Sequence, residues 1–360
     1  MLFFALLAVR GYAVLFVATG DPSYNTNAPT GSLTNSGWQY EGHWNSWLGT
    51  PIAPTFFLTA HHINGAPGNS IVLNGFSYTT TAFFDDPSTD LRIWQVAQTF
   101  PYYAPLFTKS NEVGSACVVI GRGTERGPMI TTTTTSMGHT TITTNGWLWG
   151  NTNNIERWGQ NTVSGITTDT FLHPGAQLLS AAFQSNGMTN ECDQSYNDSG
   201  GAMFIQDGTT WKLAGINYAV SDPFVSTNGV NGSTMSVAVL DYFHLYVLSG
   251  TNWVQITQHE SGGFACTRVS ARISWINSII NYNLGNDLGI TGLQTVGGDA
   301  LINLITGSNR FYRVDYTTNL VSAIWTTLTN NIPGTGGVVT VTDPGAASKT
   351  NRFYRAAIMP

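Results

Sequence analysis

The feature that most constrains the fold is a succession of short apolar runs, each closed by Gly, Pro, Asn or Asp, from residue 14 to about residue 280. Clear examples span residues 55–59, 70–73, 91–96, 117–120 and 211–216. Regular short strands separated by turn residues are typical of a β-sandwich or a β-barrel. The pattern does not alternate strand with helix, which argues against a doubly wound fold. The sequence therefore predicts an all-β protein.

The composition agrees with this prediction. Only 9% of the residues are charged, against a usual share of about 25%, and Thr, Asn, Ser and 39 Gly fill the polar positions. Long soluble helices favour Glu, Lys, Arg and Ala instead. Hydrophobic residues make up 42%, so the low charge does not indicate disorder. The net charge of -6 argues against a nucleic-acid partner, because such proteins carry a basic patch.

The N-terminus, MLFFALLAVRGYA, joins an apolar run to small residues at Gly11 and Ala13. This pattern resembles a signal peptide of residues 1–13, cleaved after Ala13. The end of the segment also fits a first strand over residues 13–18, and the two interpretations are compatible. No later stretch reaches about 18 uninterrupted apolar residues, so no transmembrane segment is expected. We therefore expect a secreted protein, either extracellular or periplasmic.

Two further segments have distinct patterns. The Thr-rich tract at residues 131–144 favours a long, exposed β-hairpin, because its β-branched residues alternate with period two. The segment 268–281 predicts a helix, since its apolar residues recur at helical spacing.

The tail contains a near-repeat, NRFYR, at residues 309–313 and again at 351–355. Two copies are too few for a solenoid and fit two similar strands of one small β-sandwich better. We therefore divide the chain into a signal peptide (1–13), a main domain (14–282), a linker (283–292) and a C-terminal β-sandwich module (293–360).

Three short motifs contain residue types suited to nucleophilic catalysis, and they occur in the order His, Asp, Ser. They are FFLTAHHI at 56–63, TDLRIWQV at 89–96 and NDSGGA at 197–202. A serine hydroxyl is a weak nucleophile that needs a base within reach and an acid to hold that base. Glycines after the serine let the backbone turn tightly, so that N–H groups converge on a developing oxyanion.

These motifs, with the later strand WKLAGI and the run GGFACTRVSARISWI, resemble the trypsin/chymotrypsin family of serine proteases, in its secreted bacterial form. The resemblance covers about residues 30–280. It implies two six-stranded antiparallel β-barrels (chymotrypsin-like) with a C-terminal helix. It also implies that His62 is the catalytic base, Asp90 the orienting acid and Ser199 the nucleophile, with the N–H groups of Asn197 and Ser199 as the oxyanion hole.

The sequence departs from the family pattern at several positions. Asn197 stands where Gly is usual, although Asn tolerates left-handed backbone better than most residues. No IVGG-type activation terminus is visible, so activation by cleavage is not expected, and Asp198 is expected to pair with a side chain. These departures keep a second interpretation open, namely a non-catalytic binding protein or adhesin built on the protease fold.

The specificity pocket implied by the resemblance includes Asp193, Asn217, Tyr218 and Phe264. Asp193 lies six positions before Ser199, where trypsin-like members hold an acid that selects Arg or Lys. A solvated loop acid is the alternative for Asp193. Phe264 lies near a position often held by Gly, so the pocket is expected to be narrowed or rebuilt.

The three cysteines lack the paired spacing of a zinc site. The resemblance places Cys192 and Cys266 on segments that flank the pocket, which suggests a Cys192–Cys266 disulfide as a hypothesis. No cysteine lies beside a motif histidine, so a thiol nucleophile is not expected. We expect no metal and no cofactor, and a protein or peptide substrate as partner.

The C-terminal module resembles the β-sandwich tails of secreted bacterial enzymes. Its aromatic residues suggest attachment to a surface or to substrate, and a purely structural or secretion-related appendage is the alternative.

Overall fold

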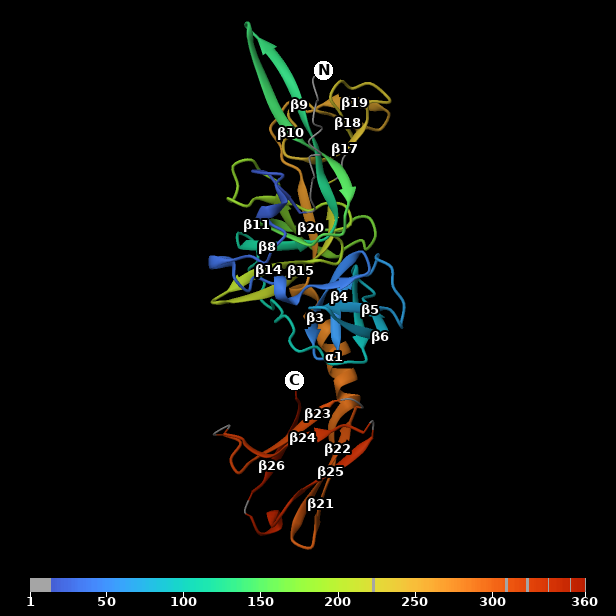
Figure 1. The fold of residues 1–360 in the computed structure, drawn as a ribbon, viewed down its shortest axis with the longest axis vertical. Helices are drawn as coiled ribbons and strands as arrows, with labels where there is room; N and C mark the ends of the chain where they lie inside the picture. The colour runs from blue at the N-terminus through green and yellow to red at the C-terminus, as the bar shows by residue number, and fades with distance from the viewer. Residues whose placement is uncertain are drawn as a thin grey trace, which may run out of the picture. The chain divides into compact units, whose positions relative to one another are not determined.

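A computed structural model describes residues 14–221, 224–307, 310–321, 324–335, 337–349 and 351–359, with backbone alone for Pro22 and residues 281–287. The expected signal peptide lies outside the described residues. The chain is mostly β, as expected, and Figure 1 shows its strands and its single long helix. It divides by its contacts into two units near Ile273. The first unit holds both barrels, and the second holds the C-terminal sheets.

The first barrel is closed and antiparallel, in the order β2-β3-β4-β7-β6-β5. An aromatic cluster fills its interior, where the rings of Trp44 and Trp94 lie 4.9 Å apart and Phe57 packs against both. The strands span β2 (Gly42–Trp44), β3 (Trp47–Ala53), β4 (Phe56–Ala60), β5 (Ser70–Leu73), β6 (Phe76–Asp85) and β7 (Leu91–Val96).

The second barrel is also closed, in the order β11-β12-β20-β15-β14-β8. Its core is built from alternate aliphatic residues such as Val119, Leu179 and Met203. The strands span β8 (Ala116–Gly121), β11 (Arg157–Thr168), β12 (Gln177–Ala182), β14 (Ala202–Asp207), β15 (Thr210–Val220) and β20 (Gly263–Arg268). The two six-stranded barrels implied by the resemblance are thus confirmed.

All three cysteines are buried free thiols in this second core, which corrects the hypothesis of a Cys192–Cys266 disulfide. The thiol of Cys266 lies 3.0 Å from Gln194 Nε2 and 3.4 Å from Asn217 Oδ1. The thiol of Cys117 donates to Asn161 O. Burial raises the pKa of each thiol, so none is a reactive thiolate.

The Thr-rich hairpin is confirmed as strands β9 (Thr124–Ser136) and β10 (His139–Thr152), paired antiparallel along their length. It also belongs to a six-stranded sheet that was not predicted, in the order β19-β18-β16-β17-β10-β9. Figure 1 shows the hairpin running out beyond the barrels beside β17–β19. The other strands are β16 (Phe224–Ser226), β17 (Met235–Val239), β18 (Tyr246–Ser249) and β19 (Asn252–Gln255).

Near the start of the described residues, a short strand, β1 (Leu15–Phe16), pairs with β13 (Cys192–Asp193). Both residues of β1 and the preceding Val14 are buried. The remaining short elements of the chain are 3-10 helices at Pro22–Tyr24, Gly31–Leu33, Trp38–Tyr40, Ser270–Arg272 and Ala346–Ser348.

The helix α1 (Ile273–Asp287) follows β20 and extends beyond its predicted end. The next strand, β21, begins at Leu288, so residues 283–292 are divided between helix and strand. No helix in the described residues is long and apolar enough to cross a membrane.

The C-terminal module contains two three-stranded sheets, β21-β22-β25 and β24-β23-β26. Their facing residues share one core, which includes Ile302, Tyr312 and Val341. The two copies of the near-repeat contribute to strands β23 and β26, which pair with each other, as predicted for paired strands. Asn309, the first residue of the first copy, lies outside the described residues. The strands span β21 (Leu288–Val296), β22 (Asp299–Thr306), β23 (Phe311–Thr317), β24 (Thr326–Pro333), β25 (Val338–Asp343) and β26 (Phe353–Ile358).

Candidate active site

Two neighbouring strands of the first barrel bring His62 and Asp90 together. Strands β4 and β7 pair antiparallel, with Ala60 opposite Leu91. His62 follows the end of β4 by two residues, and Asp90 directly precedes β7. The N–H of His61 donates to the carbonyl of Asp90 over 2.9 Å, which closes the junction. The two residues therefore lie at the same edge of the barrel.

The carboxylate of Asp90 holds both the backbone and the ring of His62. The His62 N–H donates to Asp90 Oδ1 over 2.9 Å, and His62 Nδ1 lies 2.6 Å from Asp90 Oδ2. Because an ionised carboxylate only accepts hydrogen bonds, the ring proton belongs on Nδ1 and Nε2 is left as an acceptor. Asp90 is only 2% exposed, so this contact is shielded from water.

Ser199 comes from the second barrel, in the turn before β14, and its Oγ lies 2.8 Å from His62 Nε2. The next residue, Gly200, has φ +80, and a Cβ there would lie 2.4 Å from Thr59 Oγ1 and 2.6 Å from the Leu48 carbonyl. Glycine therefore lets the serine turn approach the first barrel closely enough for the serine to reach the histidine.

Two backbone N–H groups beside Ser199 point to an oxyanion site. Asn197 adopts φ +68, the left-handed conformation that the sequence led us to expect, and its side chain donates to Thr152 Oγ1 over 3.2 Å. Within the described residues, the N–H groups of Asn197 and Ser199 donate to no acceptor of the chain. Unpaired donors near a nucleophile are suited to a developing negative oxygen.

Asp198 lies buried between these donors. It accepts from the Ser195 N–H at 2.7 Å and the Ser195 hydroxyl at 3.0 Å, and from the Gly123 N–H at 2.6 Å. The Ser195 hydroxyl is thus the expected side-chain partner. Burial raises the pKa of Asp198 to about 6, although these hydrogen bonds act in the opposite direction.

A further donor to Asp198 was not predicted. The N–H of Val14, which is fully buried, lies 3.4 Å from Asp198 Oδ2. The sequence Val14-Leu-Phe shows no IVGG pattern, so its role was missed. The contact places the predicted cleavage point after Ala13 directly beside the acid that precedes Ser199.

A pocket of about 240 Å³ opens next to Ser199. Its wall carries no charged side chain and consists of Gln194, Ser195, Tyr196, Asn197, Ser199, Tyr218, Ala219 and Val220. Of the four pocket residues expected from the sequence, only Tyr218 belongs to this wall.

The other three expected pocket residues lie in the interior, which corrects their assignment. Asp193 is fully buried in strand β13, where it pairs with Leu15 of β1, and burial raises its pKa well above the usual range. Asn217 is also fully buried, and its amide donates to the carbonyls of Ile120 and Asp198. Phe264 belongs to the second barrel core. These residues support the pocket without lining it.

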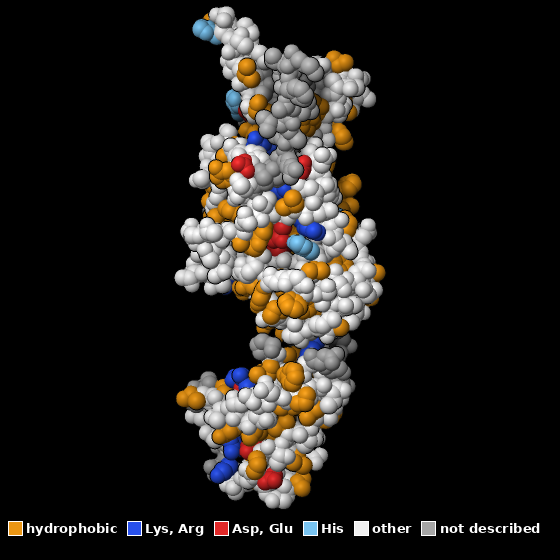
Figure 2. All heavy atoms as spheres, in the orientation of Figure 1, with side chains coloured by type: hydrophobic (Ala, Val, Ile, Leu, Met, Phe, Trp, Pro, Cys, Tyr) orange, Lys and Arg blue, Asp and Glu red, His pale blue; other side chains and the backbone are white. Residues whose placement is uncertain are grey.

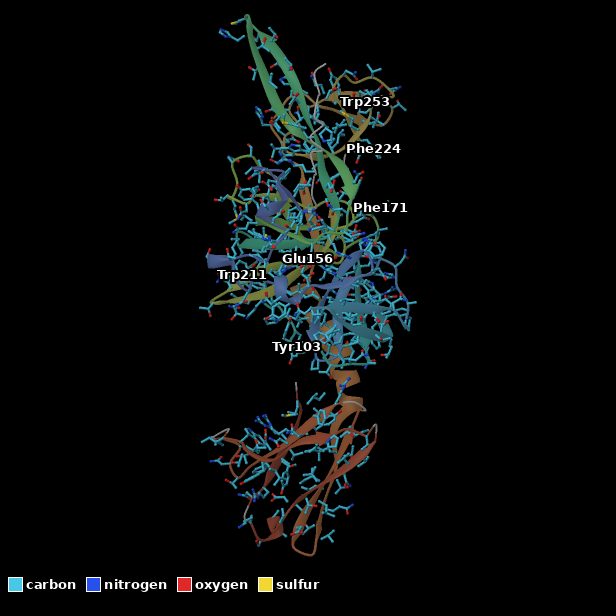
Figure 3. The ribbon with its side chains drawn as sticks, viewed as in Figure 1. Tyr103, Glu156, Phe171, Trp211, Phe224 and Trp253 are labelled. Atoms are coloured by element: carbon cyan, nitrogen blue, oxygen red, sulfur yellow. The ribbon has the colours of Figure 1, made fainter. Side chains whose placement is uncertain are left out.

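The loop between β11 and β12 supplies two residues that the sequence did not single out. Asp169 accepts from the Tyr218 hydroxyl at 2.7 Å and from the His173 N–H at 2.8 Å. His173 Nε2 then lies 3.8 Å from Asp90 Oδ1. Phe171, labelled in Figure 3, stands on the outside of this loop and is 83% exposed. A lone histidine before a Pro-Gly turn gave no signal of this proximity.

A hydrogen bond between a histidine and a carboxylate links the two barrels. Glu156, which Figure 3 labels, precedes β11 and lies 3.0 Å from His43 Nε2 of β2. Burial raises the pKa of Glu156, and the pairing with His43 opposes that shift. Figure 2 shows how few charged side chains the visible face carries, so isolated pairs of this kind stand out.

The comparisons with known proteins assign no role to any residue of the chain. No protein-family model matches the chain, and neither does any curated protein. Among solved structures, the chain is similar to neuropsin, described as a serine protease expressed in the limbic system of mouse brain, at 14% identity and a TM-score of 0.42. The match covers 68% of this chain and 96% of neuropsin. The roles of individual residues therefore rest on the geometry above.

Proposed function

We propose that the protein is a secreted serine endopeptidase that hydrolyses peptide bonds through an acyl-enzyme. The observation that carries the proposal is the unbroken hydrogen-bond chain from Asp90 through His62 to Ser199 Oγ, with contacts of 2.6 and 2.8 Å. Nothing in barrel packing requires this order of a buried acid, an imidazole and a hydroxyl. It is the arrangement that raises the nucleophilicity of a serine.

In the proposed reaction, Ser199 Oγ attacks the peptide carbonyl while His62 Nε2 takes its proton. The N–H groups of Asn197 and Ser199 stabilise the oxyanion. His62 then gives the proton to the leaving amine, and the acyl group stays on Ser199. Water, deprotonated by His62, hydrolyses this ester and restores the serine. Asp90 stabilises the charged imidazole in each step.

The test is covalent labelling with a fluorophosphonate probe of the chain that begins at Val14. The wild type should be labelled on Ser199, whereas Ser199→Ala should not be labelled. Ser77→Ala, at an exposed serine of β6, is the matched control and should label like the wild type. Equal labelling of the wild type and Ser199→Ala would favour the non-catalytic binding protein or adhesin.

We also propose that the enzyme cleaves after small or medium uncharged side chains, because the pocket wall holds no charged group. Profiling with a peptide library measures this preference. Dominant cleavage after Arg or Lys would overturn it and would restore Asp193 as the selecting acid.

Export and domain organisation complete the proposal. We propose that residues 1–13 are removed on export and that the peptidase domain (14–282) is followed by a C-terminal module (293–360) that attaches the enzyme to a surface or to substrate. Residues 283–292, expected as a linker, end α1 and begin β21 instead. N-terminal sequencing of the exported protein tests the processing, and retention at Met1 would contradict it. Cell fractionation with and without residues 293–360 tests the attachment.

A further inference from the structure

We propose that His61, Asp90 and His173 form a binding site for a divalent transition-metal ion such as Zn²⁺, and that the bound ion inhibits the peptidase. The proposed metal binding is argued from the geometry of the three residues alone. The proposed inhibition also requires that the protein is a peptidase, and so it rests on the proposed function. It departs from the sequence expectation, which included no metal.

The three side chains converge from two barrels. One ring nitrogen of each histidine and one carboxylate oxygen of Asp90 all lie within 4.8 Å of one another. The histidine rings are 6.0 Å apart between centroids. In a tetrahedral zinc site the donor atoms lie about 3.4 Å apart, so donor atoms that are up to 4.8 Å apart must approach by up to about 1.4 Å to bind the ion. The His61 side chain is 38% exposed and is free to make that movement.

The two histidines each have a further contact outside the three proposed ligands. The His173 N–H donates to Asp169, and the same loop is closed by the hydrogen bond from the Asp169 N–H to the Ala176 carbonyl at 2.8 Å. His61 Nε2 lies 3.6 Å from Asp85, which Arg92 in turn holds through two hydrogen bonds. Carboxylates behind metal-binding histidines commonly orient the ring in this way.

The donor set selects the class of metal. Two imidazoles and one carboxylate suit Zn²⁺ and similar transition ions, whereas Ca²⁺ and Mg²⁺ prefer oxygen ligands. Three protein ligands leave a fourth position open for water. The side chains of His61 and His173 are 38% and 20% exposed, so an ion can enter from solvent.

The effect on the reaction follows from the two oxygens of Asp90. Oδ2 holds the His62 ring, and Oδ1 lies on the side of His173. A cation on this carboxylate neutralises the charge that otherwise stabilises the His62 imidazolium. The ion should therefore lower kcat and leave KM nearly unchanged, because it does not touch the substrate pocket.

Binding is tested first, on untagged Ser199→Ala protein that begins at Val14, by calorimetric titration with ZnCl₂, with CaCl₂ and MgCl₂ as comparison. We expect one Zn²⁺ per chain and no comparable binding of the other two ions. Adding His173→Gln or His61→Gln should weaken Zn²⁺ binding at least about 100-fold. The matched control is His259→Gln, which removes another histidine beside a carboxylate, that of Asp241, and should leave binding unchanged.

The proposed site is wrong if Ser199→Ala does not bind Zn²⁺. It is also wrong if binding persists in both His61→Gln and His173→Gln proteins with unchanged circular dichroism.

The second experiment measures the effect of Zn²⁺ on peptidase activity. Zn²⁺ should lower the kcat of the otherwise wild-type enzyme at least about tenfold, and His173→Gln should remove that sensitivity, measured as the ratio of rates with and without the ion. Binding without inhibition overturns the regulatory half. Binding to a protein that hydrolyses nothing contradicts the proposed function and leaves the metal site standing.

Discussion

Two buried aspartates that the sequence marked as functional differ in their hydrogen-bond partners: Asp90, in the candidate active site, and Asp193, in the interior behind the neighbouring pocket. Asp90 receives the backbone N–H and the ring of His62. Asp193 is fully buried, forms no ion pair within the described residues, and has a raised pKa. A buried carboxylate remains charged and useful only where donors surround it. A motif therefore identifies an acid, and its surroundings decide its role.

The same contrast extends to the neighbouring residues. His62, Asp90 and Ser199 lie on turns at the edges of two barrels, where polar atoms meet. Phe264 lies within strand β20 and packs into the core of the second barrel. Five experiments test this difference.

The largest effect is expected from Asp90→Asn. The amide can hold the wrong tautomer of His62, so kcat should fall about 10⁴-fold while the fold is kept. Steady-state kinetics on a peptide substrate measures the change. A loss of less than about tenfold would mean that Asp90 does not orient the base.

The second effect concerns the N-terminus. A chain that begins at Val14 has an α-ammonium at Asp198, whereas a chain with residues left before Val14 offers only an amide there. Asp198 of the extended chain keeps its hydrogen bonds from Ser195 and Gly123 but lacks a cationic partner, and a charge-assisted hydrogen bond is worth about 1.5–3 kcal/mol, so the extended chain should show a kcat/KM about 10- to 100-fold lower. Equal activity of the two chains would show that the terminus has no role.

The pH dependence of stability gives an independent check on the same contact. In the extended chain the folded-state pKa of Asp198 is about 6, above its unfolded value, so folding favours the protonated acid. That contribution is present at low pH and is lost as the pH rises through about 6. The α-ammonium of the shorter chain favours the carboxylate, so its thermal stability should not fall over the same range.

The third effect is on stability. Phe264→Ala should lower the free energy of unfolding by about 3–5 kcal/mol, because it leaves a cavity in the second barrel core. Urea denaturation measures it. Phe224→Ala, at a phenylalanine that is 62% exposed, is the control and should change stability by no more than about 0.5 kcal/mol. A changed cleavage preference with intact stability would instead make Phe264 a pocket residue.

The smallest effect on activity is expected from Asp193→Asn, the counterpart of Asp90→Asn. Cleavage preference and kcat should stay the same, because Asp193 does not line the pocket. Its raised pKa means that the wild type loses stability as the pH rises through the folded-state value. The variant should therefore melt higher at neutral and alkaline pH, by about 2–4 °C for each kcal/mol gained. A lost preference for a basic residue would contradict this.

Much of the fold was predictable because its signals are local. Strands β5 and β7 match their predicted ranges, and the Thr-rich tract forms the expected hairpin. The alternation of side chains along a strand and the turn residues that end it involve only a few consecutive positions. They can therefore be recognised without knowledge of the rest of the chain. The six-stranded sheet around that hairpin was missed, since its pairing joins segments about 100 residues apart.

The sequence by itself indicated a strand-rich fold, and its resemblance to a protease family implied the two barrels and the three residues of the proposed triad, because nucleophilic catalysis demands particular side chains in recognisable turns. Only the tertiary structure decided which buried groups meet them. In the structure the N–H of Val14 lies near Asp198 and the ring of His173 lies near Asp90. Asp193 and Phe264 are buried in the interior. These contacts join residues far apart in the chain, and they depend on packing and burial, which have no local signature in the sequence.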